Sequence, residues 1–273
     1  MQQVGHLNTA TMTSKPTLVF VPGAWHTAET WNRTIAELQP KGFECIAVTL
    51  PSTVNVAAGF GDDVKAVQDA VRTESNKGRD VVLIVHSYGG HVGNSAIKGF
   101  AEKAHDDTVK SQVRDESSGF IIGMAMIATG FSITGLNFLE LLGGSPPPFW
   151  VADTEKGTAR LTVDTRELFY HDLPEEEGKA WVDKLVPHSL KSLSEGGEYT
   201  YAGWKDIPCW YLLATEDHSL PEEVGEMFVK GALDAGADVT MRKIAASHSP
   251  MLSQPQKTAE FILEAVSAFP PSK

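Results

Sequence analysis

The sequence predicts an α/β protein with a doubly wound, mostly parallel sheet. Two observations support this prediction. Short, almost wholly apolar runs recur along the chain, and a segment of helical periodicity follows nearly every one. Strands covered on both faces need such continuous apolar runs, and helices supply the crossovers between parallel strands. With 273 residues and 42% hydrophobic content, the chain is long enough for one large domain with an insertion.

Six strands are expected in chain order, at residues 17–22, 43–50, 80–86, 119–130, 207–215 and 237–244. Apolar residues recur at helical spacing after the first strand, at positions 31, 35 and 38, and after the second, at positions 64, 67 and 71. Helices are also expected after the third strand, from Pro221 onward, and up to Phe269. A helix between successive strands is typical of a parallel sheet.

The alternation stops between residues 131 and 203, which contain glycine and proline clusters and no strand comparable to the others. This region is predicted to be a helical cap, inserted into an α/β core formed by residues 16–130 and 204–273. Residues 1–15 lack the basic and apolar regions of a secretory signal, so they are predicted to be a disordered tail. Met12 stays open as an alternative start.

Composition limits the partners that the chain can bind. A net charge of −12 disfavours nucleic acid and anionic membranes, since both require a basic patch. No apolar stretch is long enough to span a membrane, so a cytoplasmic protein with a small-molecule substrate is expected. Cys45 and Cys209 lie in apolar runs and are predicted to be buried thiols. Nine histidines without a metal-binding spacing indicate no metal; no cofactor is expected, and a homodimer stays an open alternative.

Three residues of complementary chemistry follow predicted strands. Ser87 lies in "HSYGG", Asp217 in "EDHSLP" and His248 in "AASHSP". The carboxyl ends of parallel strands meet at one edge of a sheet, so these residues are expected to lie together. A serine hydroxyl becomes an effective nucleophile when a histidine takes its proton and an acid orients that histidine. The alternatives are a structural serine in a glycine-rich loop, an acid that caps a helix, and Glu216 in place of Asp217.

Attack on a carbonyl builds negative charge on its oxygen, and backbone N–H groups must already point at that oxygen. The N–H of Tyr88 directly follows the predicted nucleophile, and the N–H of Ala24 lies in the loop after the first strand. These two groups are predicted to form the oxyanion hole.

These segments resemble the α/β-hydrolase superfamily, and more closely its branch of plant methylesterases and hydroxynitrile lyases. "LVFVPGAWHTAETW" is similar to that branch's oxyanion loop, "HSYGG" to its nucleophile turn, "ATEDHSLPEE" to its acid turn and "SHSPMLSQP" to its histidine loop. The resemblance implies that Ser87, Asp217 and His248, in this chain order, form a catalytic triad. Val85 departs from the Gly-x-Ser-x-Gly pattern, because it stands in place of the first glycine.

The triad and the resemblance together predict a small esterase of fungal or bacterial type. It would cleave a carboxylic ester or lactone of a mostly apolar molecule through an acyl-enzyme. The residues expected to contact the substrate are His26, Trp25, Phe131, Phe149 and Trp150, and packing within the cap is the alternative for the aromatic side chains. Two other functions stay open: a C–C bond lyase or cyclase that uses the same triad, and a ligand-binding receptor.

Overall fold

The structure is a computed structural model that describes residues 15–113 and 117–272. The tail predicted for residues 1–15 therefore falls almost wholly outside the described residues. Both cysteines are free thiols, with Cys45 half-buried and Cys209 buried. Within the described ranges, no helix combines the length and the apolar character that a membrane span requires.

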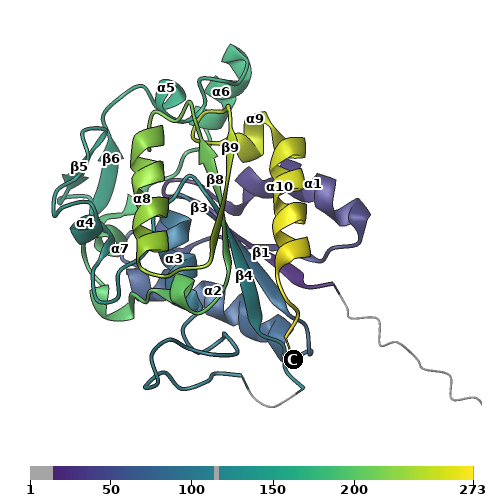
Figure 1. Ribbon diagram of the computed structural model, residues 1–273. Helices are drawn as coiled ribbons and strands as arrows, with labels where there is room; N and C mark the ends of the chain where they lie inside the picture. The colour runs from purple at the N-terminus through teal and green to yellow at the C-terminus, as the bar shows by residue number, and fades with distance from the viewer. Residues whose placement is uncertain (1–14, 114–116, 273) are drawn as a thin grey trace, which may run out of the picture.

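Six parallel strands form the central sheet, in the spatial order β2-β1-β3-β4-β8-β9 (Figure 1). They match the six predicted strands and are β1 (Thr17–Val21), β2 (Cys45–Ala47), β3 (Val81–His86), β4 (Ile121–Ile127), β8 (Cys209–Ala214) and β9 (Val239–Ile244). Every residue of β1 and β3 is buried, because helices cover both faces of a parallel sheet. The predicted mostly parallel sheet is confirmed.

Helices pack on both faces of this sheet. They are α1 (Asn32–Leu38), α2 (Phe60–Ser75), α3 (Tyr88–Ala96), α8 (Glu222–Asp234), α9 (Pro250–Ser253) and α10 (Pro255–Ala268). α1 packs against α10 on one side of the sheet, α2 packs against α3 on the other, and α8 packs against β8 and β9 (Figure 1). Short 3-10 helices lie at Ala28–Trp31, Gln39–Lys41, Pro51–Thr53, Gly197–Tyr199 and Gly203–Lys205.

The segment between residues 131 and 203, called the cap below, is not purely helical. Its helices are α4 (Phe138–Leu141), α5 (Thr165–Phe169), α6 (Glu175–Val182) and α7 (Leu190–Ser194). It also contains a small antiparallel sheet of β5 (Trp150–Asp153), β6 (Thr158–Leu161) and β7 (His188–Ser189). The segment thus contains helices, as predicted for a helical cap, and in addition short strands that were not predicted. These strands have two to four residues each, too few for an alternating or continuous apolar pattern to indicate them.

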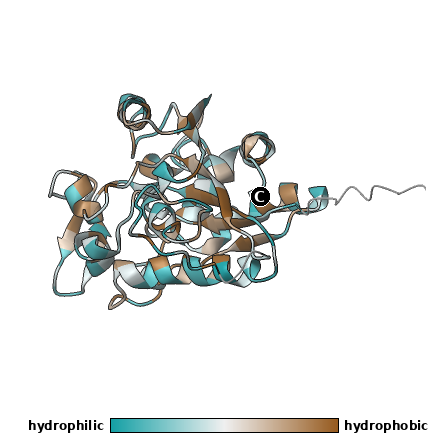
Figure 2. Cartoon of the chain, turned by 60° about the horizontal axis from the view of Figure 1, so that its bottom comes forward, coloured by the Kyte–Doolittle hydropathy of each residue, from teal (hydrophilic) through white to brown (hydrophobic). Residues whose placement is uncertain are grey.

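The buried apolar side chains lie mainly between the sheet and its helices. Figure 2 shows hydrophobic residues along the central strands and hydrophilic residues on the outer turns of the helices. Since all six strands are parallel, their carboxyl ends lie along one edge of the sheet, below the cap. The loops that leave this edge carry all three residues of the predicted triad.

Candidate active site

Ser87 forms the turn between β3 and α3. Its backbone has φ 52° and ψ −127°, a region that residues other than glycine adopt rarely. The glycines that follow allow this turn to pack tightly. A Cβ atom on Gly89 would lie 2.4 Å from the carbonyl oxygen of Pro22, and one on Gly90 would lie 2.0 Å from Thr129 Oγ1. The two glycines are therefore needed because other parts of the chain occupy the space of their side chains.

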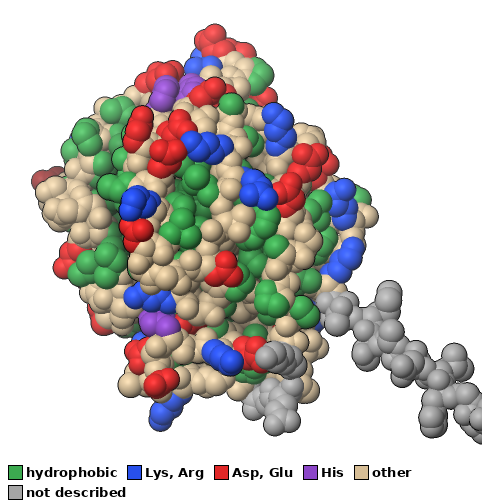
Figure 3. Space-filling model, in the orientation of Figure 1, with side chains coloured by type: hydrophobic (Ala, Val, Ile, Leu, Met, Phe, Trp, Pro, Cys, Tyr) green, Lys and Arg blue, Asp and Glu red, His purple; other side chains and the backbone are tan. Residues whose placement is uncertain are grey.

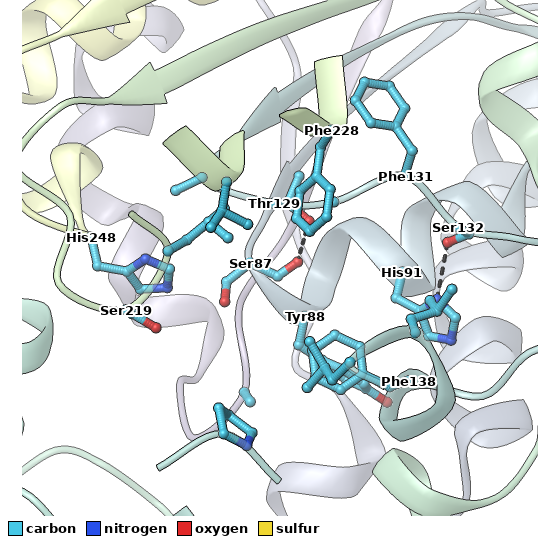
Figure 4. Close-up of a pocket in the computed structure, with 18 of the residues that line it drawn as sticks. Ser87, Tyr88, His91, Thr129, Phe131, Ser132, Phe138, Ser219, Phe228 and His248 are labelled. Carbon is cyan, nitrogen blue, oxygen red and sulfur yellow. Dashed lines mark hydrogen bonds between the residues drawn. The ribbon is translucent and has the colours of Figure 1, made fainter. Parts of the chain in front are cut away.

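A hydrogen bond from β4 also holds the turn. The Thr129 hydroxyl donates to the carbonyl oxygen of Ser87 over 2.5 Å, drawn as a dashed line in Figure 4. The Tyr211 hydroxyl donates in turn to the carbonyl oxygen of Thr129 over 2.6 Å. The uncommon backbone conformation of Ser87 is thus fixed by neighbours on two adjacent strands.

Val85, the departure from the Gly-x-Ser-x-Gly pattern, is accommodated by a glycine farther along the chain. A Cβ atom on Gly93, in α3, would lie 2.5 Å from Val85 Cγ1. The valine methyl group therefore fills the space that a side chain at position 93 would need. The strand and the helix approach each other closely although the usual glycine is absent from the strand.

Asp217 and His248 are joined by a buried hydrogen bond. Nδ1 of His248 donates to Oδ2 of Asp217 over 2.7 Å, and both residues are at most 5% exposed. The other oxygen of Asp217 accepts from the backbone N–H groups of Ser219 and Leu220, so this carboxylate has a partner at each oxygen. Glu216 is exposed instead. The geometry thus favours Asp217 over its neighbour as the residue that orients His248 and leaves Nε2 free to accept a proton.

The loop that carries His248 is held from both the core and the cap. Nε2 of His86 donates to the carbonyl oxygen of His248 over 2.8 Å, and the two rings pack with centroids 4.7 Å apart. Burial, together with the nearby His248, holds the pKa of His86 well below its usual range, so the ring is neutral. From the cap, Oδ2 of Asp172 accepts from the N–H of Ser247 over 3.0 Å. Asp172 could not be predicted from the sequence, because the contact joins segments 75 residues apart.

The predicted oxyanion donors lie on either side of the serine. Tyr88 is the first residue of α3, and the first N–H groups of a helix have no partner within it. Ala24 follows Gly23, and a Cβ atom on Gly23 would lie 3.0 Å from Ser87 Cβ, so the loop after β1 packs directly against Ser87. Both Ala24 and Tyr88 line the same cavity as Ser87. Their placement supports the predicted oxyanion hole.

The loop after β1 is bound to the cap through Trp25, which has φ 61°. Every polar group of this residue is paired with a cap residue. Its backbone N–H donates to Nδ1 of His188 over 3.4 Å, its carbonyl oxygen accepts from the N–H of Val186 over 3.0 Å, and its indole N–H donates to the carbonyl oxygen of Ala159 over 2.8 Å. The cap therefore determines the conformation of the loop that carries Ala24.

Two neutral histidines fix the peptide group between Ala24 and Trp25. Nδ1 of His26 donates to the carbonyl oxygen of Ala24 over 2.6 Å, and its Nε2 accepts from the Tyr170 hydroxyl over 2.6 Å. Burial lowers the pKa of His26 to about 4 and that of His188 to about 3. Both nitrogens of His26 are already bonded, so the ring can contact a substrate through its face.

One cavity of about 650 Å³ brings the predicted residues together. It is lined by Ala24, Trp25, His26, Ser87, Tyr88, Phe131, Phe149, Trp150 and His248, whereas Asp217 lies behind His248. Figure 4 shows the Ser87 hydroxyl on the side of the cavity where His248 lies, with Phe131 and Phe228 across from them. Trp150 is 2% exposed, so it also packs within the cap. Residues of α8 also form part of the wall. They could not be predicted from the sequence, because an apolar helix face is equally typical of core packing.

A model of the alpha/beta hydrolase family matches residues 18–261, which is most of the chain. The chain belongs to this family. The predicted fold class and the predicted enzyme class, a hydrolase, are thereby confirmed.

This hydrolase is 28% identical over 259 residues to an alpha/beta hydrolase named nvfD from Aspergillus novofumigatus, with 92% of this chain and 96% of the relative covered. Among solved structures, a methylesterase from Arabidopsis superposes with a TM-score of 0.69 at 17% identity, covering 92% of this chain and 99% of that one. Tomato methylketone synthase I, complexed with 2-tridecanone, superposes with a TM-score of 0.72 at 16% identity, covering 94% and 99%. These two structures show that the chain shares its fold with a methylesterase and a methylketone synthase.

The contact between Val85 and Gly93 can be tested in this hydrolase by a double-mutant cycle. Gly93→Ala should lower the free energy of unfolding by about 1–3 kcal/mol, because its Cβ would overlap Val85 Cγ1. Val85→Ala removes that atom, so the double variant should be more stable than the sum of the single effects by roughly 0.5–3 kcal/mol. Urea denaturation of the four proteins measures this coupling. Additive effects would mean that the strand and the helix do not depend on this fit.

The role of His188 can be tested by two substitutions that differ in one acceptor. His188→Phe keeps a ring but removes the acceptor for the Trp25 N–H, and should lower kcat on the order of 10- to 100-fold because the oxyanion loop loses its position. His188→Asn keeps an acceptor near the same place and should recover part of the loss, with KM changed less than kcat. Steady-state kinetics on folded variants measures both. An unchanged kcat in His188→Phe would show that the loop holds its position without this bond.

Proposed function

We propose that this hydrolase cleaves carboxylic esters or lactones of small, mostly apolar molecules through an acyl-enzyme on Ser87. The observation that carries the proposal is the buried hydrogen bond between His248 and Asp217, placed in the same cavity as a serine with a strained backbone. This combination suits nucleophilic catalysis, since it supplies a nucleophile, a base and an orienting acid.

The proposed reaction proceeds through acylation and deacylation of Ser87. Nε2 of His248 accepts the Ser87 hydroxyl proton while the serine oxygen attacks the ester carbonyl, and Asp217 stabilises the imidazolium that forms. The N–H groups of Ala24 and Tyr88 hold the oxyanion. The imidazolium then protonates the departing alcohol, which leaves the acyl group on Ser87. Water activated by His248 completes the cycle by releasing the acid.

The character of the cavity supports an apolar substrate. Among the described residues that line it, none is Asp or Glu, and Lys205 is the only lysine or arginine. Aromatic side chains from both the core and the cap form much of the wall. The printed name of the Arabidopsis neighbour, a methylesterase, supports ester cleavage as the reaction. The lyase or cyclase and the receptor stay predictions without a specific observation in their favour.

Replacement of the nucleophile tests the proposal most directly. Ser87→Ala should lower kcat for p-nitrophenyl butyrate by several orders of magnitude, because the covalent intermediate is lost. The parent protein should be labelled by a fluorophosphonate probe, and the variant should not. Circular dichroism and melting temperature would serve as controls for folding. A folded variant that keeps activity within tenfold of the parent would rule out Ser87 as the nucleophile.

A matched pair of substitutions tests the acid. Asp217→Asn should lower kcat by roughly 10³- to 10⁴-fold, because the amide stabilises neither the required tautomer nor the imidazolium. Glu216→Gln should stay within about twofold of the parent, since surface substitutions have small effects. Kinetics on the same ester compares them. A greater loss in the glutamate variant would exchange the two assignments.

A further inference from the structure

The cavity extends far beyond the triad along one face of α8. The residues of this helix that line it are Pro221, Val224, Met227, Phe228, Gly231, Ala232 and Ala235. These positions recur at intervals of three and four, so they share one face of the helix. The strip that they form, from position 224 to position 235, is called the α8 groove below.

The two ends of the α8 groove differ in their chemistry. Ser219 and Leu220, just before the helix, line the cavity and donate to Asp217, which holds His248. The first turn of α8 is therefore the end near the triad, and Ala235 marks the distant end. A rise of 1.5 Å per residue places Val224 and Ala235 about 16 Å apart along the helix. The groove is thus much longer than a methyl or acetyl group.

Small residues keep the distant half of the groove open. Gly231 is helical, and a Cβ atom on it would have no neighbour within 4 Å. Two alanines, at positions 232 and 235, line the same stretch. Near the triad, by contrast, the groove carries the larger Val224 and Phe228. Space is therefore left beyond Phe228, where a bound molecule can extend.

The rim of the groove is apolar although it faces solvent. Three lining side chains from both of its sides are among the exposed large hydrophobics: Ile133 at 55%, Leu142 at 39% and Met227 at 60%. Figure 3 shows hydrophobic side chains among charged ones on the face that α8 occupies. Exposed apolar residues that border one continuous hollow mark a binding surface more often than residues scattered singly.

We propose that the α8 groove binds an elongated, uncharged alkyl arm of an ester whose reacting carbonyl lies at Ser87. This inference rests on the proposed function, and it adds the substrate class. The groove is continuous with the space around the triad, because it begins at the residues that hold Asp217. A molecule that fills the groove can therefore be part of the same ester that reacts at Ser87. Each methylene that the groove removes from water should raise the binding constant roughly fourfold. Esters with long arms should therefore be preferred strongly over esters with short ones. The arm can belong to the acyl or to the alcohol part of the ester.

Gly231 is the position at which to test this inference. Gly231→Phe should place a ring in the open space and lower the ratio of kcat/KM for p-nitrophenyl laurate over p-nitrophenyl butyrate by tenfold or more, equivalent to two or more lost methylenes. A second series, dodecyl acetate against butyl acetate, places the arm on the alcohol. The series whose ratio falls identifies the part of the ester that occupies the groove.

Two control variants separate the groove from general effects. Gly231→Ala tests the change in backbone freedom, and Lys230→Phe adds the same ring to the neighbouring position, which does not line the cavity. Lys230→Phe should keep the laurate-to-butyrate ratio within about twofold of the parent, because surface changes outside a site have small effects. Gly231→Ala adds only a methyl group to the groove, so it should lower the ratio less than Gly231→Phe does. Unchanged ratios for Gly231→Phe in both series, with both esters still cleaved through Ser87, would overturn the groove inference and leave the proposed function standing.

A binding measurement tests the groove even if the proposed function fails. In the Ser87→Ala background, calorimetric titration should show that dodecyl acetate binds at least tenfold more tightly than butyl acetate, and Gly231→Phe should remove the difference. If the parent cleaves no ester but this binding preference is present, the proposed function fails and the groove stands. Equal affinities for the two acetates would contradict the groove itself.

Discussion

Ser87 keeps a backbone conformation, φ 52° and ψ −127°, that an L-amino acid adopts only when its surroundings hold it there. Those surroundings are close contacts between backbone segments. Gly89 and Gly90 leave room for the loop after β1 and for Thr129, and Gly93 leaves room for Val85. The hydroxyl stands at the edge of the sheet because the strand, the turn and the helix leave no other arrangement, and every other part of the site is positioned against it.

Around this turn, polar histidine rings are buried. Three buried histidines bind the loops beside it, and burial keeps their pKa values low. His26 and His188 bind the peptide group before and at Trp25, while His86 binds the carbonyl oxygen of His248. The loops that carry the reacting groups are thereby held by side chains that cannot ionise at neutral pH.

The cap contributes to the catalytic machinery as well as to the cavity wall. All polar groups of Trp25 form hydrogen bonds with cap residues, and Asp172 accepts a hydrogen bond from the backbone beside His248. A movement of the cap would therefore displace both the oxyanion loop and the histidine loop. The α8 groove follows a helix of the core, and the cap residues Ile133 and Leu142 lie on its rim.

The sequence by itself determined the sheet and which residues of complementary chemistry follow its strands. Continuous apolar runs require a covered sheet, and its parallel strands bring Ser87, Asp217 and His248 to one edge whatever the side chains around them. Only the tertiary structure decided what those residues contact. The short cap strands, the partner of Val85 in Gly93 and the bonds of His26 join segments distant in sequence, and no local periodicity records such contacts. The open space beside Gly231 likewise could not be predicted, because it depends on how the surrounding side chains pack and not on any residue alone.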